Sequence, residues 1–216
     1  DDYILFYARS LDGVEYDADD DAFRHYIHHY SKVNVIWLTH SKTNGKRITS
    51  RPSASQSGLI AESSFRDLVF LEEELTNFYK SGEKWLGGSL SSTQSSRSYL
   101  FSMPDAIPQE ETTVRAMVAS TTSGTHNYNL AVNGNDIGTF SGSGSSSRYR
   151  YIFKEVKTEG VLIDGNNTVT VEYQTFVDNM FSYVDWVEVE YNRKFQAQND
   201  QLIFNAPVKD GAALYN

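Results

Sequence analysis

The stretch that decides the fold class is residues 179–193, which reads NMFSYVDWVEVEYNR. It is rich in β-branched and aromatic residues, the types that favour a pleated, half-buried surface. Val184, Val187 and Val189 supply apolar side chains to both faces of the segment. We therefore expect a long buried strand, with Trp186 buried in it.

Upstream of this strand, from residue 85 onward, short strand patterns alternate with turn signals. Asn133-Gly134 is the strongest hairpin signal of the chain, and residues 141–147 (SGSGSSS) form a Gly/Ser loop. Six or seven strands at this spacing predict a β-sandwich of the jelly-roll type. The predicted strands before the last one cover residues 99–102, 112–120, 127–132, 137–140, 149–155 and 168–173.

The first part of the chain is less regular. Strands are predicted at residues 2–8 (DYILFYA) and 32–40 (KVNVIWLTH), the second followed by a turn at Asn44-Gly45. Residues 65–80 (FRDLVFLEEELTNFYK) have apolar residues at helical spacing, which predicts a short helix. The alternative for this block is a strand over residues 67–71 followed by a single helical turn.

These patterns predict an all-β fold in two β-rich modules, with at most one short helix near residues 68–80. The first module is expected at residues 1–81, and the β-sandwich or jelly roll at residues 82–193. Residues 194–216 are expected to form a linker and a strand. That strand either leads into a following domain or returns to the first module.

Composition narrows the classes of function. Aromatic residues make up 13% of the 216 residues, which is too many for a disordered chain. The net charge of −9, without a local basic patch, disfavours nucleic-acid binding. The absence of cysteine excludes disulfides, thiolate zinc sites and a cysteine nucleophile within these residues.

The sequence also bears on location. No apolar run approaches the roughly 20 residues that a membrane-spanning helix needs. The chain begins DDYILFYARS, without an initiator Met or a signal peptide. We expect an extracellular or outer-membrane-associated protein whose signal peptide is absent from this sequence.

An acidic run suggests calcium. Asp17, Asp19 and Asp21 match the first three ligand positions of an EF-hand loop. The match then fails, because Ala22 replaces the required Gly and His28 replaces the bidentate Glu. A looser calcium loop at the three aspartates and a solvated charged loop both remain open.

Three histidines cluster directly after this run. On a helix, His25 and His29 would share one face, as in some zinc sites, with His28 beside them. No HExxH motif or further ligand supports a zinc site. Packed aromatic residues and surface histidines are the alternative.

Aromatic residues of the second module could bind sugars. Candidates for a glycan platform are Trp85, Tyr128 and Tyr149, with Tyr99, Tyr151 and Trp186 also available. The alternative is that a β-sandwich buries these aromatic residues in its core. The sequence contains no GxSxG elbow and no glycine-rich phosphate loop, and no carboxylate pair stands out. We therefore predict no catalytic residue and no cofactor other than calcium.

Several short segments, taken in order, resemble the region before the catalytic domain in gingipain-related cysteine peptidases. The resemblance is greatest to the PorU-type sortases of type IX secretion in Bacteroidetes-type bacteria, and it spans most of the chain. The segments are DYILFYA at 2–8, YD at 16–17, His25, YS at 30–31, WLT at 37–39, SG at 81–82 with Trp85 and Gly87, YVDWVEVEYNR at 183–193, QLIF at 201–204, Gly211 and Tyr215.

In that family the catalytic Cys and His lie in a later domain, so the resemblance implies a non-catalytic chain. It implies docking, positioning or regulation of a downstream catalytic domain, or binding to another secreted protein. The alternative from the residues is a carbohydrate-binding jelly-roll module of an exported protein.

Overall fold

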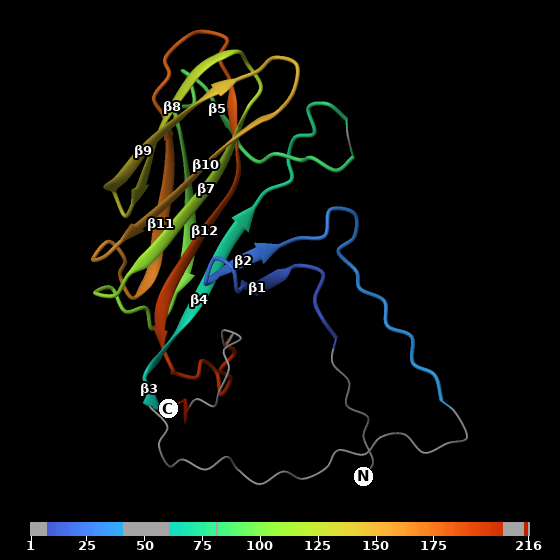
Figure 1. Ribbon diagram of the computed structural model, residues 1–216, viewed down its shortest axis with the longest axis vertical. Helices are drawn as coiled ribbons and strands as arrows, with labels where there is room; N and C mark the ends of the chain where they lie inside the picture. Colours follow the sequence, from blue (N-terminus) through green and yellow to red (C-terminus); the bar gives the residue numbers. More distant parts are fainter. Residues whose placement is uncertain (1–7, 41–60, 81, 205–213, 216) are drawn as a thin grey trace.

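The computed structural model describes residues 8–40, 61–80, 82–204 and 214–215 (Figure 1). Two antiparallel sheets face each other, and these residues contain no helix, so the predicted all-β class is confirmed. The first sheet has the order β10 (Arg150–Thr158), β7 (Thr112–Ser120), β12 (Ser182–Lys194) and β4 (Ser64–Glu72), with β5 (Ser89–Leu90) beside β12. The second has the order β6 (Ser96–Met103), β11 (Gly165–Tyr173), β8 (Gly124–Val132) and β9 (Asn135–Gly144).

Strand β12 organises the first sheet. It pairs with β7 on one side and with β4 on the other, and a β-bulge lies between Val184 and Trp186. The bulge inserts one residue, which lets Val184 and Val187 both point into the core. Trp186 is thereby turned to the outer face and is half-buried, so the expectation that it is buried was wrong.

The core lies between the two sheets. The second sheet contributes large side chains such as Phe101, Leu130 and Val171, all buried against the inner face of the first. Asn133 and Gly134 join β8 to β9 with φ angles of 51° and 80°, the left-handed conformations that a type I′ hairpin turn requires. The hairpin predicted there is confirmed.

Residues 65–80 do not form the predicted helix. Strand β4 pairs with β12 over nine residues, from Trp186 opposite Glu72 to Lys194 opposite Ser64. The hydrogen bonds and buried area that the sheet offers outweigh the local helical spacing. The predicted alternative, a strand in this block, is confirmed, although β4 is longer than expected and no helical turn follows it.

The first sheet therefore extends across residue 82, where the sequence suggested a boundary between modules. Whether residues 1–81 and 82–193 fold as independent units is a separate question, so the two-module division stays a prediction. β3 (Ala61–Glu62) pairs in parallel with β13 (Leu214–Tyr215), so the end of the chain returns to a segment within residues 1–81. No helix of the described ranges has the length and apolarity to cross a membrane.

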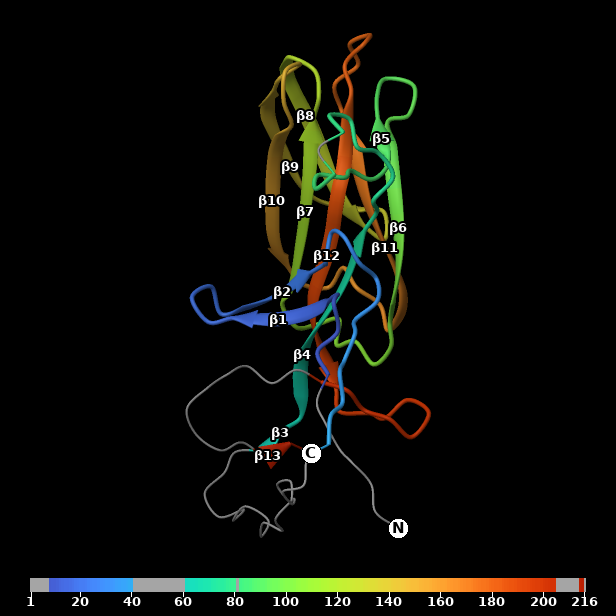
Figure 2. The same ribbon diagram turned by 90° about the vertical axis from the view of Figure 1, so that its right-hand side faces the viewer.

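A hairpin of β1 (Gly13–Asp17) and β2 (Ala22–Tyr26) lies across the outer face of the first sheet (Figure 2). After it, residues 33–40 form no strand with any described part of the chain, contrary to prediction. Local alternation cannot supply the partner that a strand needs. The predicted strand at residues 2–8, apart from its last residue, Ala8, and the turn at Asn44-Gly45 lie outside the described residues.

Candidate functional site

The outer face of the first sheet has two chemically different halves, which follow from strand register. One cross-strand row joins Phe153, Met117, Trp186 and Glu72. The next rows down the sheet carry charged groups on β10, β7 and β12. We call the first region, with Tyr149, Tyr151 and Trp85 beside it, the aromatic half. The charged half consists of Glu155, Arg115, Glu188 and Glu190.

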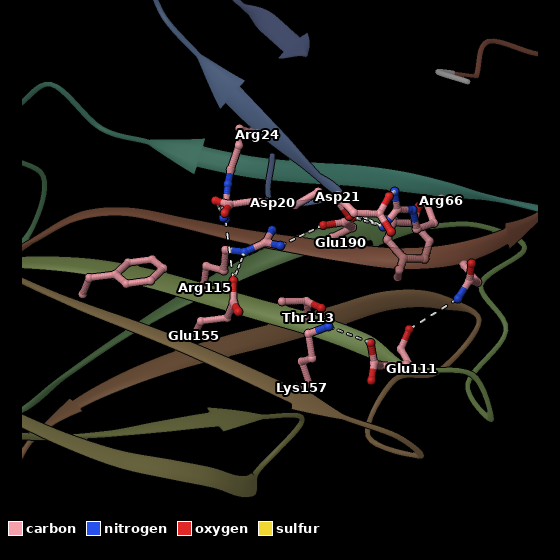
Figure 3. Close-up of a pocket in the computed structure, with 14 residues that line it drawn as sticks. Asp20, Asp21, Arg24, Arg66, Glu111, Thr113, Arg115, Glu155, Lys157 and Glu190 are labelled. Atoms are coloured by element: carbon pink, nitrogen blue, oxygen red, sulfur yellow. Dashed lines mark hydrogen bonds and ion pairs between the residues drawn. The ribbon is translucent and has the colours of Figure 1, made fainter. Parts of the chain in front are cut away.

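Arg115 is the centre of the charged half. Its side chain is 2% exposed, and its guanidinium donates to Glu188 at 3.1 Å. It also donates to Glu155 at 2.6 Å and to Glu190 at 2.9 Å (Figure 3). Burial alone would lower the pKa of Arg115, but hydrogen bonds to Glu155 and Glu190 raise it. The planar fork of an arginine suits three carboxylates placed around it.

His25 fastens the hairpin to this network. Its Nδ1 lies 2.6 Å from Glu188 and its Nε2 lies 3.0 Å from Glu72. Burial favours the neutral ring, but the hydrogen bonds with Glu188 and then Glu72 raise the pKa of His25 to about 9. The imidazolium is therefore the form at neutral pH, and both ring nitrogens donate. Its ring also stacks on Phe70 at 4.7 Å between centroids.

A second set of contacts holds the turn of the hairpin. Arg66 of β4 lies 3.0 Å from Asp21 and 3.2 Å from Glu190. Phe23, next in β2, is almost completely buried. The hairpin is thus fixed to the sheet by both ion pairs and an apolar anchor.

A crevice of about 390 Å³ lies between the hairpin and the charged half (Figure 3). Its walls include Arg24, Arg66 and Arg115, each in an ion pair with a carboxylate. Lys157, at its rim, pairs with Glu111 at 3.2 Å. Because these charges neutralise one another, the arrangement suits attachment of the hairpin better than capture of an ion.

The aspartates of the predicted calcium loop lie in the turn of this hairpin. Asp17 accepts the backbone N–H groups of Asp19 and Asp20, as in a turn stabilised by its first residue. Asp21 accepts a hydrogen bond from Tyr16 and pairs with Arg66. The carboxylates of Asp17 and Asp21 are thus engaged with different partners, and a calcium site at Asp17, Asp19 and Asp21 stays a prediction that this geometry does not favour.

The three histidines diverge. His25 points into the sheet, whereas Nδ1 of His28 accepts the N–H groups of Tyr30 and Ser31. His29 lies 3.9 Å from Glu74. Across the described ranges, no three His, Asp or Glu side chains are grouped so that they could hold a metal ion.

The aromatic half contains a second hollow, of about 230 Å³. Trp85 and Tyr151 line it and are 37% and 42% exposed. Asp185, the bulge residue of β12, lies in it too. Burial, and then the charge of Glu72, raise the pKa of Asp185 to about 7.

The predicted glycan residues are divided between this surface and the core. Trp85 lines the hollow, and Tyr149 lies next to it, with its ring centroid 6.2 Å from that of Tyr151. Tyr128, by contrast, is fully buried, and its hydroxyl lies 2.6 Å from Oγ of Ser182. Tyr128 therefore cannot be part of a surface platform.

Tyr151, another of the aromatic candidates from the sequence, also belongs to this surface. Tyr149, just before β10, and Tyr151 and Phe153 within it alternate at the period of a strand. That spacing predicts that the three rings share one face of the sheet.

A serine and a histidine meet in the interior. Oγ of Ser120 lies 2.8 Å from Nε2 of His126, and the hydroxyl of Tyr173 lies 2.7 Å from its Nδ1. All three side chains are buried, and burial lowers the pKa of His126. A substrate cannot reach this Ser120 hydroxyl, so the trio serves packing and not acyl transfer.

Proteins similar to this chain are found among solved structures and not by sequence. No family model and no curated protein matches the sequence. The crystal structure of dimeric latent PorU from Porphyromonas gingivalis superposes with a TM-score of 0.64 at 16% identity, over 90% of this chain. The chain spans about a fifth of the length of that protein, since the match covers 19% of it.

Carbohydrate-binding modules give weaker matches. A family 36 module in complex with calcium and xylotriose aligns at 16% identity with a TM-score of 0.38, over 56% of this chain and 98% of its own. A family 35 module from Cellvibrio japonicus aligns at 16% identity with a TM-score of 0.40, over 59% and 97%. At 16% identity, the comparison with PorU shows a shared fold and nothing more specific.

Proposed function

We propose that this chain is a non-catalytic, β-rich region of a gingipain-like cysteine peptidase of the type IX secretion sortase type. Its role is to dock on, position or regulate a downstream catalytic domain of a secreted or outer-membrane-associated protein. The fold likeness to PorU over nine-tenths of the chain supports this proposal. The interior position of the Ser120–His126 pair fits a region without its own chemistry.

The observation that carries the docking role is the segment at residues 33–38. Its apolar side chains are exposed, Trp37 by 87%, and Val35, Ile36 and Leu38 are exposed as well. Apolar residues on both faces of an extended segment are typical of a strand in a sheet that is covered on both sides. Such a segment can join the open edge of another protein's sheet and gain both hydrogen bonds and burial.

These 216 residues contain no cysteine, so maleimide labelling read by mass spectrometry on the peptide that contains position 37 gives a direct test. In the 216-residue chain, a Trp37→Cys variant should react with a maleimide at the rate of an exposed thiol. In the polypeptide encoded by the complete reading frame, docking should slow labelling of the same position at least about tenfold. Phe176→Cys is the control, because Phe176 is also exposed, at 69%, but lies on a distant loop.

Two results would refute the proposal. One is a reading frame without a downstream peptidase domain. The other is equal labelling of position 37 in the short and complete polypeptides, with the Phe176→Cys control unchanged.

The aromatic half favours a second candidate function, binding of a glycan. It combines exposed rings at Trp85 and Tyr151 with a carboxyl group at Asp185 in one hollow. Pockets that bind small molecules pair aromatic walls with a few polar groups in this way. A glycan array read out with the isolated chain tests this function.

A further inference from the structure

We propose that the aromatic half is a binding site for a short, soluble, uncharged oligosaccharide, with Trp85 and Tyr151 as its contact residues. The inference rests on the second candidate function, and it names the site and the ligand class. Three features of the described residues carry it: the inclination of the rings, the size of the hollow and the charge of its rim.

The rings in and beside the aromatic half are inclined to one another and do not form one flat platform. The planes of Tyr149 and Tyr151 are inclined by 60°, those of Tyr79 and Tyr149 by 57°, and those of Phe153 and Trp186 by 52°. A flat polymer surface needs coplanar rings to stack on. Inclined rings instead suit a flexible soluble chain whose apolar sugar faces meet one ring at a time.

The hollow limits how much of the ligand is enclosed. Its volume of about 230 Å³ lies below the roughly 300–1,000 Å³ of pockets for drug-sized molecules. It therefore holds about one sugar ring. Further sugar units would extend over Tyr149 and Tyr79, whose centroids are 4.7 Å apart.

The tyrosines make this surface amphipathic. The hydroxyl of Tyr149 accepts the N–H groups of Phe78 and Tyr79, which fixes its ring beside the hollow. Tyr151, which carries both a ring and a hydroxyl, lines the hollow and is partly exposed. A sugar has an apolar face and polar edges, so it matches this combination better than a purely apolar ligand does.

The charges of the hollow select against acidic sugars. Three acidic side chains, Glu72, Glu83 and Asp185, line it beside two basic ones. Lys84 lies 3.8 Å from Glu83, and His29 lies 3.9 Å from Glu74. A carboxylate on the ligand would meet like charges in a half-buried site. Sugar hydroxyls, in contrast, can donate to these carboxyl groups without a charge conflict.

Calorimetric titration of the intact 216-residue chain tests the site. The probes are cellotriose, the trimer of N-acetylglucosamine and trigalacturonic acid. We expect at least one neutral trimer to bind, and trigalacturonic acid to bind at least about tenfold more weakly. Trp85→Ala and Tyr151→Ala should each weaken the neutral trimer about tenfold or more. Phe176→Ala, which removes an exposed ring elsewhere, should change its affinity less than about twofold.

The possible outcomes distinguish a failure of this particular site from a failure of glycan binding as a whole. Binding of a neutral trimer that survives both Trp85→Ala and Tyr151→Ala would keep glycan binding but refute this site. Tighter binding of trigalacturonic acid than of the neutral trimers would refute the ligand class. No binding of any probe up to about 10 mM would refute both the site and the second candidate function. Thermal unfolding of each variant verifies that it is folded. If either Trp85→Ala or Tyr151→Ala fails to fold, the other variant still tests the site.

Discussion

Replacing Arg115 with methionine tests how the hairpin is held on the sheet. Methionine fills a similar volume but leaves Glu188 and Glu190, which are 1% and 5% exposed, without their central cation. Removing one partner of a buried ion pair costs about 3–5 kcal/mol. Three charged hydrogen bonds at about 1.5–3 kcal/mol each would give more, but His25 and Arg66 still contact the two carboxylates.

We therefore expect Arg115→Met to lower the free energy of unfolding by about 3–4 kcal/mol. For a chain of this size that corresponds to a fall in Tm of roughly 10 °C. Urea unfolding followed by circular dichroism measures the change. Lys157→Met is the matched control, because Lys157 pairs with Glu111 on the exposed rim. It should cost less than about 1 kcal/mol.

Adding Glu190→Gln to Arg115→Met distinguishes uncompensated charge from lost packing. If buried charge causes the loss, the double variant should be less destabilised than the sum of the two single variants. A loss for Arg115→Met no larger than that of Lys157→Met would refute the view that this network holds the hairpin.

Three further predictions follow from individual side chains. The pKa of His25, about 9 in the folded protein, lies above its unfolded value of about 6.5, so its stabilisation is present below pH 6.5 and is lost as pH rises through 9. Urea titrations should show the free energy of unfolding fall by about 3 kcal/mol over this pH range, and His25→Phe should remove this dependence on pH. Tyr128→Phe should cost about 1 kcal/mol, because it removes the buried hydroxyl contact with Ser182, and it should leave oligosaccharide affinity unchanged; a loss of affinity would contradict the core position of Tyr128. Trp37→Ser should change the stability of the isolated chain by less than about 0.5 kcal/mol, and a larger loss would show that Trp37 packs within this chain.

The sequence predicts those elements whose signal is local. The strand predicted at residues 112–120 matches β7 residue for residue, and the turn at Asn133-Gly134 has the φ angles that its residues favour. The block at residues 65–80 was misjudged because its apolar spacing fits a helix, whereas its partner β12 lies more than 100 residues away. A pattern of local spacing contains no information about such a partner.

The same reasoning explains what could be predicted of the site. His25 was noticed as a metal candidate, but its partners Glu72 and Glu188 come from strands far away in sequence. The sequence offers Trp85, Tyr128 and Tyr149 equally as aromatic candidates, and Tyr128 differs from the other two through its place on the inner sheet face. Composition finds aromatic residues, and strand register decides which of them face outward.

Hydrogen exchange at the backbone amides of residues 33–38 tests the proposed docking role most directly. It should be measured by mass spectrometry in the 216-residue chain and in the polypeptide of the complete reading frame. Docking by strand addition predicts fast exchange in the short chain and protection of these amides in the complete polypeptide. Equally fast exchange in both would contradict a docking role for this segment.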